Sequence, residues 1–185
     1  MKKIDFVLFI LTFLSSIAAV VAQDKFYTKN GNASFYSEAP IENIQAHNKS
    51  ATCVLDSKTG EIQFSLLMKG FEFRKALMQE HFNEDYMDSD KFPRSEFKGQ
   101  IVNNKDVNYS KNGDYTVKVK GNLVIHGVTK EIETDGKVTV SDNKILIGSE
   151  FSIELPDYDV KNDRFNNISN HIKIVVNCSL ELLKK

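Results

Sequence analysis

The chain has 185 residues, 41% of them hydrophobic and 26% charged, which is the composition of a globular protein and excludes a disordered one. A formal net charge of −1 without any basic run argues against a nucleic-acid partner. The length fits one domain.

The N-terminal residues have the layout of a secretory signal peptide. Two lysines precede an apolar run from Phe6 to about Val21, and a small-residue sequence that resembles a cleavage site ends at Ala22. The run spans about 16 residues, short of the roughly 20 that cross a bilayer. We therefore expect a signal peptide over 1–22, cleavage near Ala22 and export to the periplasm or the medium. The mature chain, 23–185, is then a single domain without a transmembrane segment.

Apolar and polar residues alternate in the first part of the mature chain, which predicts strands. Phe26–Ser37 is the first, and residues 48–56 and 62–68 form a hairpin around the turn residues of Asp56–Gly60. At Gly70 the apolar positions change from even to odd numbers. A shift of one residue beside glycine predicts a β-bulge or a bend.

The stretch 71–97 differs in period from the chain on either side. Five residues recur at the spacing of one helical stripe: Leu77, Met78, His81, Phe82 and Tyr86. We predict one inserted helical segment at about 74–88 that ends before Pro93. Its apolar stripe predicts a lid over whatever the strands enclose.

Strand alternation resumes after this segment and continues to the end of the chain. The apolar positions predict strands at 97–101, 115–125, 128–140, 145–155 and 172–182, mostly joined by short turns. The fold class is therefore all-β, an antiparallel barrel or sandwich of about eight strands with one helix. A barrel of about eight strands is just wide enough to hold one ligand.

Two segments resemble a known family. LMQEHFNEDYMDSDKFPRSEFKG, followed after a polar interval by GNLVIHGVTKEIE, is similar to the paired signature of the YceI-like family. The resemblance covers essentially the whole mature chain. It implies a lipocalin-like antiparallel barrel, exported in bacteria, with members that hold a long polyisoprenoid chain in the barrel interior. The chain departs from the family in having no Trp, and its two cysteines belong to no motif that can be carried over.

The inward-facing aromatic residues fit either a pocket lining or a filled barrel core. Flat side chains without hydrogen-bond donors suit an alkenyl chain. The resemblance favours a cavity for an isoprenoid or another long-chain amphiphilic lipid, bound without a cofactor and without covalent chemistry. The predicted ligand contacts are Phe64, Leu66, Phe71, Phe73, Leu77, Met78, His81, Phe82, Phe92, Phe97, Tyr115, Val117, Leu123 and Phe151.

The histidines suggest an alternative function. His81 and Asp85 are separated by four residues on the predicted helix, a spacing that can present two metal ligands or an acid/base pair. Together with His126 they would suit a metal-dependent or other barrel enzyme or stress protein. The simpler interpretation is a hydrogen-bonded, partly buried His81 and a structural His126, because no nucleophile or phosphate-binding motif accompanies them.

Cationic residues flank the predicted helix. Arg74 and Arg94 are candidates to bind a polar or phosphate head group at the mouth of the barrel, since arginine contacts phosphate bidentately. The alternative is a solvated face that nearby carboxylates balance.

The sequence does not decide between two states of the cysteines. Cys53 and Cys178 are either a disulfide pair in an oxidising compartment or small buried hydrophobic residues. The sequence leaves the oligomeric state undetermined, with a homodimer among the options.

Overall fold

A computed structural model describes residues 25–38, 43–142, 144–161 and 168–183. The predicted signal peptide and Pro40 lie outside these residues. The elements in chain order are β1 (Lys25–Ser37), β2 (Ile44–Asp56), β3 (Glu61–Leu67), η1 (Met68–Gly70), β4 (Glu72–Phe73), α1 (Ala76–His81), η2 (Phe82–Tyr86), β5 (Arg94–Ile101), η3 (Asn104–Asp106), β6 (Gly113–Ile125), β7 (Val128–Ser141), β8 (Lys144–Glu154), η4 (Leu155–Tyr158) and β9 (His171–Leu182).

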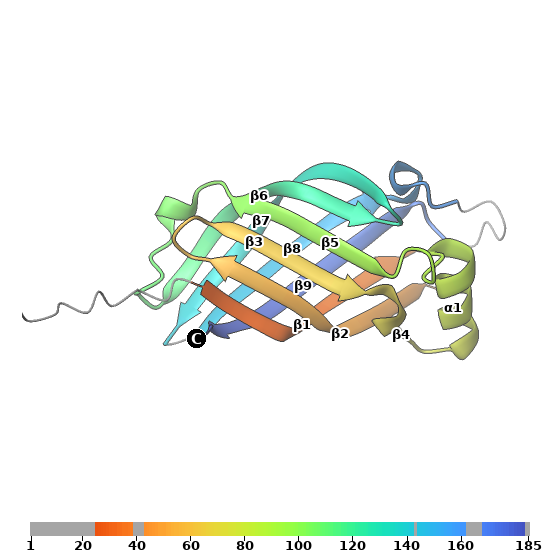
Figure 1. Cartoon of the computed structure of the whole chain (residues 1–185), viewed down its shortest axis with the longest axis horizontal. Helices are drawn as coiled ribbons and strands as arrows, with labels where there is room; N and C mark the ends of the chain where they lie inside the picture. Colours follow the sequence, from red (N-terminus) through yellow and green to blue (C-terminus); the bar gives the residue numbers. More distant parts are fainter. Residues whose placement is uncertain (1–24, 39–42, 143, 162–167, 184–185) are drawn as a thin grey trace, which may run out of the picture.

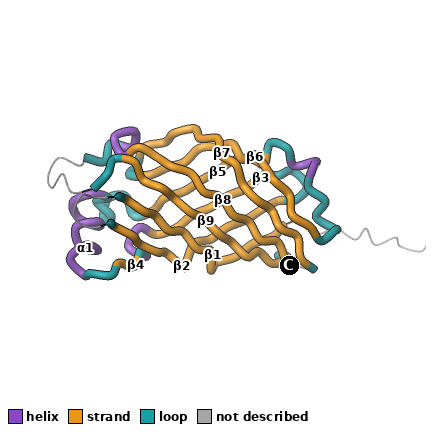
Figure 2. The backbone as a smooth tube through the Cα atoms, turned by 180° about the vertical axis from the view of Figure 1, so that it is seen from behind, coloured by secondary structure: helices purple, strands orange, loops and turns teal. Residues whose placement is uncertain are grey.

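The strands close into a barrel whose neighbours are all antiparallel. The order is β1-β9-β8-β7-β6-β5-β3-β2, and pairing of β1 with β2 completes the ring, while the short β4 adds to the outer end of β2. Figures 1 and 2, which view the molecule from opposite sides, show the strands tilted across it. The predicted antiparallel barrel of about eight strands with one inserted helix is confirmed within the described residues.

A tight turn joins β6 to β7 and explains the His126-Gly127 pair. Ile125 pairs with Val128, so His126 and Gly127 alone form the loop. Both have positive φ, 51° at His126 and 77° at Gly127, the combination that a type I′ hairpin turn requires. A side chain at Gly127 would also collide with Phe92, since a Cβ there would lie 2.5 Å from its ring.

The bend predicted at Gly70 is a single turn of 3-10 helix. η1 follows β3 directly, and the amide of Phe71 donates to the carbonyl of Met68. Residues Glu72 and Phe73 then pair with the outer part of β2. The shift of the apolar positions therefore marks the point where the chain leaves the barrel wall and starts towards the lid.

The lid consists of α1 and the π-helical turn η2. Figure 1 shows it at the end of the barrel opposite the C-terminus. Phe82 and Met87 are buried, and Met78, His81 and Tyr86 are partly buried. Leu77 is 61% exposed, so its assignment to the inward stripe is wrong. At 100° per residue the stripe centres on Met78 and Phe82, which turns Leu77 to the side.

The wall between β7 and β8 is paired over only part of its length. Their ladder runs from Ser141 and Lys144 to Gly136 and Ser149 and goes no further within the described residues. Beyond it, β7 still pairs with β6 as far as Val128, and β8 still pairs with β9 as far as Glu154. The two strands therefore separate towards the lid end. The buried Leu155 and Tyr158 of η4 lie at this end, where the carbonyl of Tyr158 contacts His126 Nδ1 at 3.2 Å.

No helix in the described part of the chain is long and apolar enough to cross a membrane.

Candidate functional site

The barrel interior contains a cavity of about 380 Å³. This volume lies within the range of about 300–1,000 Å³ that is typical of ligand sites, and it exceeds the roughly 150 Å³ of an engineered cavity that binds benzene. Inward-facing residues of every barrel strand contribute to its wall. The lining is largely aliphatic and aromatic, so the space suits an apolar molecule.

Four phenyl rings pack together under the lid, and we call them the phenyl cluster: Phe35, Phe71, Phe73 and Phe82. Phe82 stacks on Phe35 at a centroid distance of 5.4 Å and an interplanar angle of 20°. It also meets Phe71 at 5.5 Å and Phe73 at 5.0 Å. The lid is therefore anchored to the barrel through Phe82, and the cluster forms the wall of the cavity at the lid end.

The opposite end of the barrel is filled. A second core cluster there includes Leu55, Ile145 and Leu180, each at most 1% exposed. Cys53 and Cys178 are buried between this core and the cavity, and both are free thiols. The two thiols hydrogen-bond to each other; this bond, together with burial, raises the pKa of Cys53. The structure thus contains them as small buried residues that close the cavity floor.

Several polar side chains reach the cavity wall, and most are already bonded to the protein. Ser34 contacts His47 Nδ1 at 2.8 Å, and Ser95 donates to the carbonyl of Val124 at 2.8 Å. His81 Nδ1 lies 2.7 Å from Asp85 Oδ2 on the lid. Beside this pair, burial and then the charge of Asp85 raise the pKa of Tyr86, so its hydroxyl stays protonated. The wall therefore offers few unbonded polar groups to a ligand.

Eleven of the fourteen predicted ligand contacts line this cavity. They come from β3, β4, β5, β6 and β8, from the lid and from the residue after η1, although nothing in the sequence shows that these segments meet. They are Phe64, Leu66, Phe71, Phe73, Met78, His81, Phe82, Phe97, Val117, Leu123 and Phe151.

The structure does not bring the other three predicted contacts to the cavity wall. Leu77 faces away from the barrel. Phe92 packs edge-on against His126 at 4.5 Å, outside the cavity, and so joins the two segments that carry the family resemblance. The hydroxyl of Tyr115 donates to the carbonyls of Asn108 and Lys111, both at 3.2 Å, near the filled end. Phe92 and Tyr115 thus have structural roles that alternation or helical spacing alone does not reveal.

The two arginines and His126 are also placed away from the wall. Arg74 and Arg94 are exposed and are not among the lining residues. His81 lines the cavity, whereas His126 does not, and each has its own hydrogen-bond partner. Within the described residues, no group of three His, Cys, Asp or Glu side chains is arranged to hold a metal ion.

Sequence reasoning missed several lining residues. Phe35 belongs to the phenyl cluster, Met87 is 5% exposed, and Thr134 and Ser149 bring hydroxyls to the wall. The strand residues among them lie at inward positions of alternating strands, which is the signal that could have found them. Alternation does not show how far along the barrel the cavity extends.

Comparison with known proteins supports this description. The model of the YceI-like domain matches residues 23–180. A polyisoprenoid binding domain from Saccharophagus degradans, implicated in plant cell wall breakdown, superposes with a TM-score of 0.76 at 14% identity, covering 86% of this chain and 99% of that one. Comparison with curated protein sequences gives no significant match.

Two further solved structures share the fold. BcnA of Burkholderia cenocepacia has a TM-score of 0.66 at 15% identity and covers 81% of this chain and 95% of its own. The YceI protein of Campylobacter jejuni has a TM-score of 0.61 at 16% identity, with 80% and 90% covered. At these identities the structures show the likeness in fold, and the domain match shows the family. The chain belongs to the YceI-like family.

Proposed function

We propose that this chain is an exported protein that holds an isoprenoid or similar amphiphilic lipid in its barrel cavity, for sequestration or transport. The observation that carries the proposal is the largely apolar cavity of about 380 Å³ beneath the phenyl cluster. Each buried methylene contributes about 0.8 kcal/mol, so a long hydrocarbon chain binds with few polar contacts. The eleven predicted residues that line the cavity are the proposed contacts.

The family and the solved relatives support a binding role. The Saccharophagus degradans relative is described as a polyisoprenoid binding domain, which agrees with an apolar ligand in the same kind of barrel. The binding role needs no covalent chemistry. The N-terminal sequence supports export to the periplasm or medium after cleavage near Ala22.

Native mass spectrometry of the mature chain, produced by export and extracted mildly, tests the proposal. We expect an added mass in the range of a lipid. The bare mature mass under several extraction conditions would contradict it, and the added mass of a metal ion would instead support the enzyme alternative with His81 and His126. The same spectra show whether the protein is a monomer or a homodimer.

A further inference from the structure

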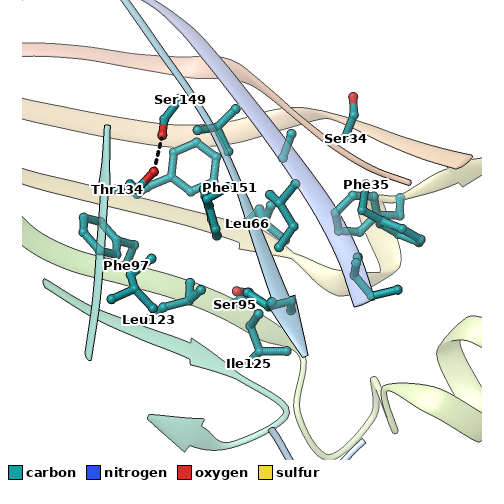
Figure 3. Close-up of a pocket in the computed structure, with 18 of the residues that line it drawn as sticks. Ser34, Phe35, Leu66, Ser95, Phe97, Leu123, Ile125, Thr134, Ser149 and Phe151 are labelled. Carbon is teal, nitrogen blue, oxygen red and sulfur yellow. Dashed lines mark hydrogen bonds between the residues drawn. The ribbon is translucent and has the colours of Figure 1, made fainter. Parts of the chain in front are cut away.

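Thr134 of β7 and Ser149 of β8 bring two hydroxyl groups together on the cavity wall. Their oxygens lie 3.3 Å apart, and both residues line the cavity. Figure 3 shows the pair pointing towards each other, well separated from Phe35 of the phenyl cluster. The cavity therefore has a polar spot away from the lid.

The hydroxyl pair lies where the two strands begin to separate. The β7–β8 ladder ends at Gly136 and Ser149, so the carbonyl of Asp135 has no strand partner on β8. It accepts instead from the hydroxyl of Ser149 at 2.8 Å and from that of Thr134 at 3.2 Å. The local fold thus holds both hydroxyls in position before any ligand arrives.

The wall beside the pair leaves room for a ligand group. Gly136, which pairs with Ser149 at the end of the ladder, lines the cavity and contributes no side chain. Phe97 and Phe151, which line the same cavity, supply apolar surface on either side. A hydrocarbon chain that contacts these rings can bring its polar end to the hydroxyls.

The hydrogen-bond donors and acceptors of the two hydroxyls determine which ligand group they can bind. Each hydroxyl has one hydrogen and two lone pairs. The hydrogen of Ser149 goes to the carbonyl of Asp135, and that of Thr134 goes to the same carbonyl or to Ser149. The lone pairs that remain accept hydrogen bonds, so the pair suits a ligand group that donates one.

The charges around the pair disfavour an anion. No Lys or Arg is among the described residues that line the cavity. Glu133, Asp135 and Glu150 occupy the outward positions next to the pair, and Lys118 and Lys173 are already bonded to Asp135 and Glu150. A phosphate or carboxylate bound at the pair inside the barrel would therefore lose its hydration without gaining a cation of the lining as partner.

We propose that Thr134 and Ser149 bind the neutral hydroxyl end of the ligand, so that the cavity prefers a long-chain alcohol to its phosphorylated form. This inference rests on the proposed lipid-binding function. It also competes with the prediction that Arg74 and Arg94 bind an anionic head group at the mouth.

Three probes with the same C15 isoprenoid skeleton test the proposal: farnesol, farnesene without the hydroxyl, and farnesyl diphosphate. Each displaces the fluorescent dye N-phenyl-1-naphthylamine from the mature wild-type protein and from the double variant Thr134→Val/Ser149→Ala. We expect the double variant to bind farnesol about two- to tenfold more weakly, the loss that one hydrogen bond accounts for, and to bind farnesene as before. We expect wild-type protein to bind farnesol more tightly than the diphosphate.

Thr129→Val/Ser152→Ala is the matched control. It removes the same two chemical groups from exposed, outward positions of the same strands, so all affinities should stay unchanged. Farnesene binding reports whether the cavity of each variant is intact, which separates a lost hydrogen bond from a misfolded protein.

Two results would overturn the inference. One is an equal loss of farnesol and farnesene affinity in an otherwise folded double variant. The other is preferential binding of the diphosphate that is lost in Arg74→Ala/Arg94→Ala, which would place the polar end at the arginines. If wild-type protein binds none of the three probes, the proposed function itself fails, which is a different outcome.

Discussion

Gly31 of β1 lies between two strands whose cysteine thiols meet over it. Cys53 belongs to β2 and Cys178 to β9, and β1 separates these strands in the barrel. A Cβ at position 31 would lie 2.7 Å from Cys178 Sγ and 3.0 Å from the carbonyl oxygen of Ala51. The pairing of β1 is irregular around this residue on both sides. A glycine is needed here because the Cys178 thiol and the backbone of Ala51 occupy the space of a side chain.

This arrangement predicts that Gly31→Ala destabilises the protein. Overpacking of a tight site costs about 1–3 kcal/mol in the free energy of unfolding. Adding Cys178→Ala removes the nearer clashing atom and should recover part of that loss. Urea denaturation of the two single variants and the double variant measures the coupling. Strictly additive effects would show that the sulfur is not the obstacle.

The lid illustrates how much the sequence reveals about an element. Its helical spacing and the shift at Gly70 are local patterns, and both were predicted correctly. The orientation of Leu77 was not, because six residues of α1 make less than two turns and a small rotation moves a flanking residue out of the stripe. Phe35 was missed since its contact with the lid joins segments far apart in sequence.

Substitutions of two lid residues, Phe82 and Leu77, should therefore differ sharply in their effect on stability. Phe82 is 9% exposed and contacts three other phenyl rings, so Phe82→Ala should lower the free energy of unfolding by about 3 kcal/mol. Leu77→Ala should change it by no more than about 0.5 kcal/mol. Chemical denaturation measures both. Similar values for the two variants would mean that the lid does not pack through Phe82.

The separation of β7 from β8 could not be predicted. Lys130 makes the alternation from Val128 to Thr134 less regular than that of β6, but alternation records only which face is buried and carries no information on whether a second neighbour pairs with the backbone. The hydroxyls of Thr134 and Ser149 therefore gain their significance only from the three-dimensional structure. The barrel as a whole was predictable, since its short hairpins leave little choice of neighbours.

At the scale of the whole molecule, stability should fall in alkaline solution. Burial raises the pKa of Tyr109 from 10.0 to about 12, and the pKa values of Cys53 and Tyr158 are also raised above 9.0 and 10.0. The unfolded chain releases these protons at lower pH than the folded protein. The stabilisation is thus fully present below about pH 9 and is lost as the pH rises towards 12.

Urea denaturation between about pH 8 and 12 measures this loss, because the range runs from below the ordinary pKa values of 9.0 and 10.0 to the folded-state pKa of Tyr109. Tyr109→Phe removes one titrating group along with its 2.7 Å hydrogen bond to Asn104, so the variant should start less stable but lose about 1–2 kcal/mol less over this range. An equally steep decline in the variant would show that Tyr109 does not contribute.

The position of β9 between β1 and β8 has a consequence for how the molecule is made. Phe26 pairs with Leu182, so the first and last described strands meet, and the ring cannot close before β9 has been synthesised. Until then β1 and β8 each carry an unpaired edge, which is the feature that promotes association between chains. Pairing at such long sequence separation also folds slowly. The folding chain therefore passes through an open sheet that is prone to association with other chains. Pairing of β9 with β1 and β8 removes both exposed edges.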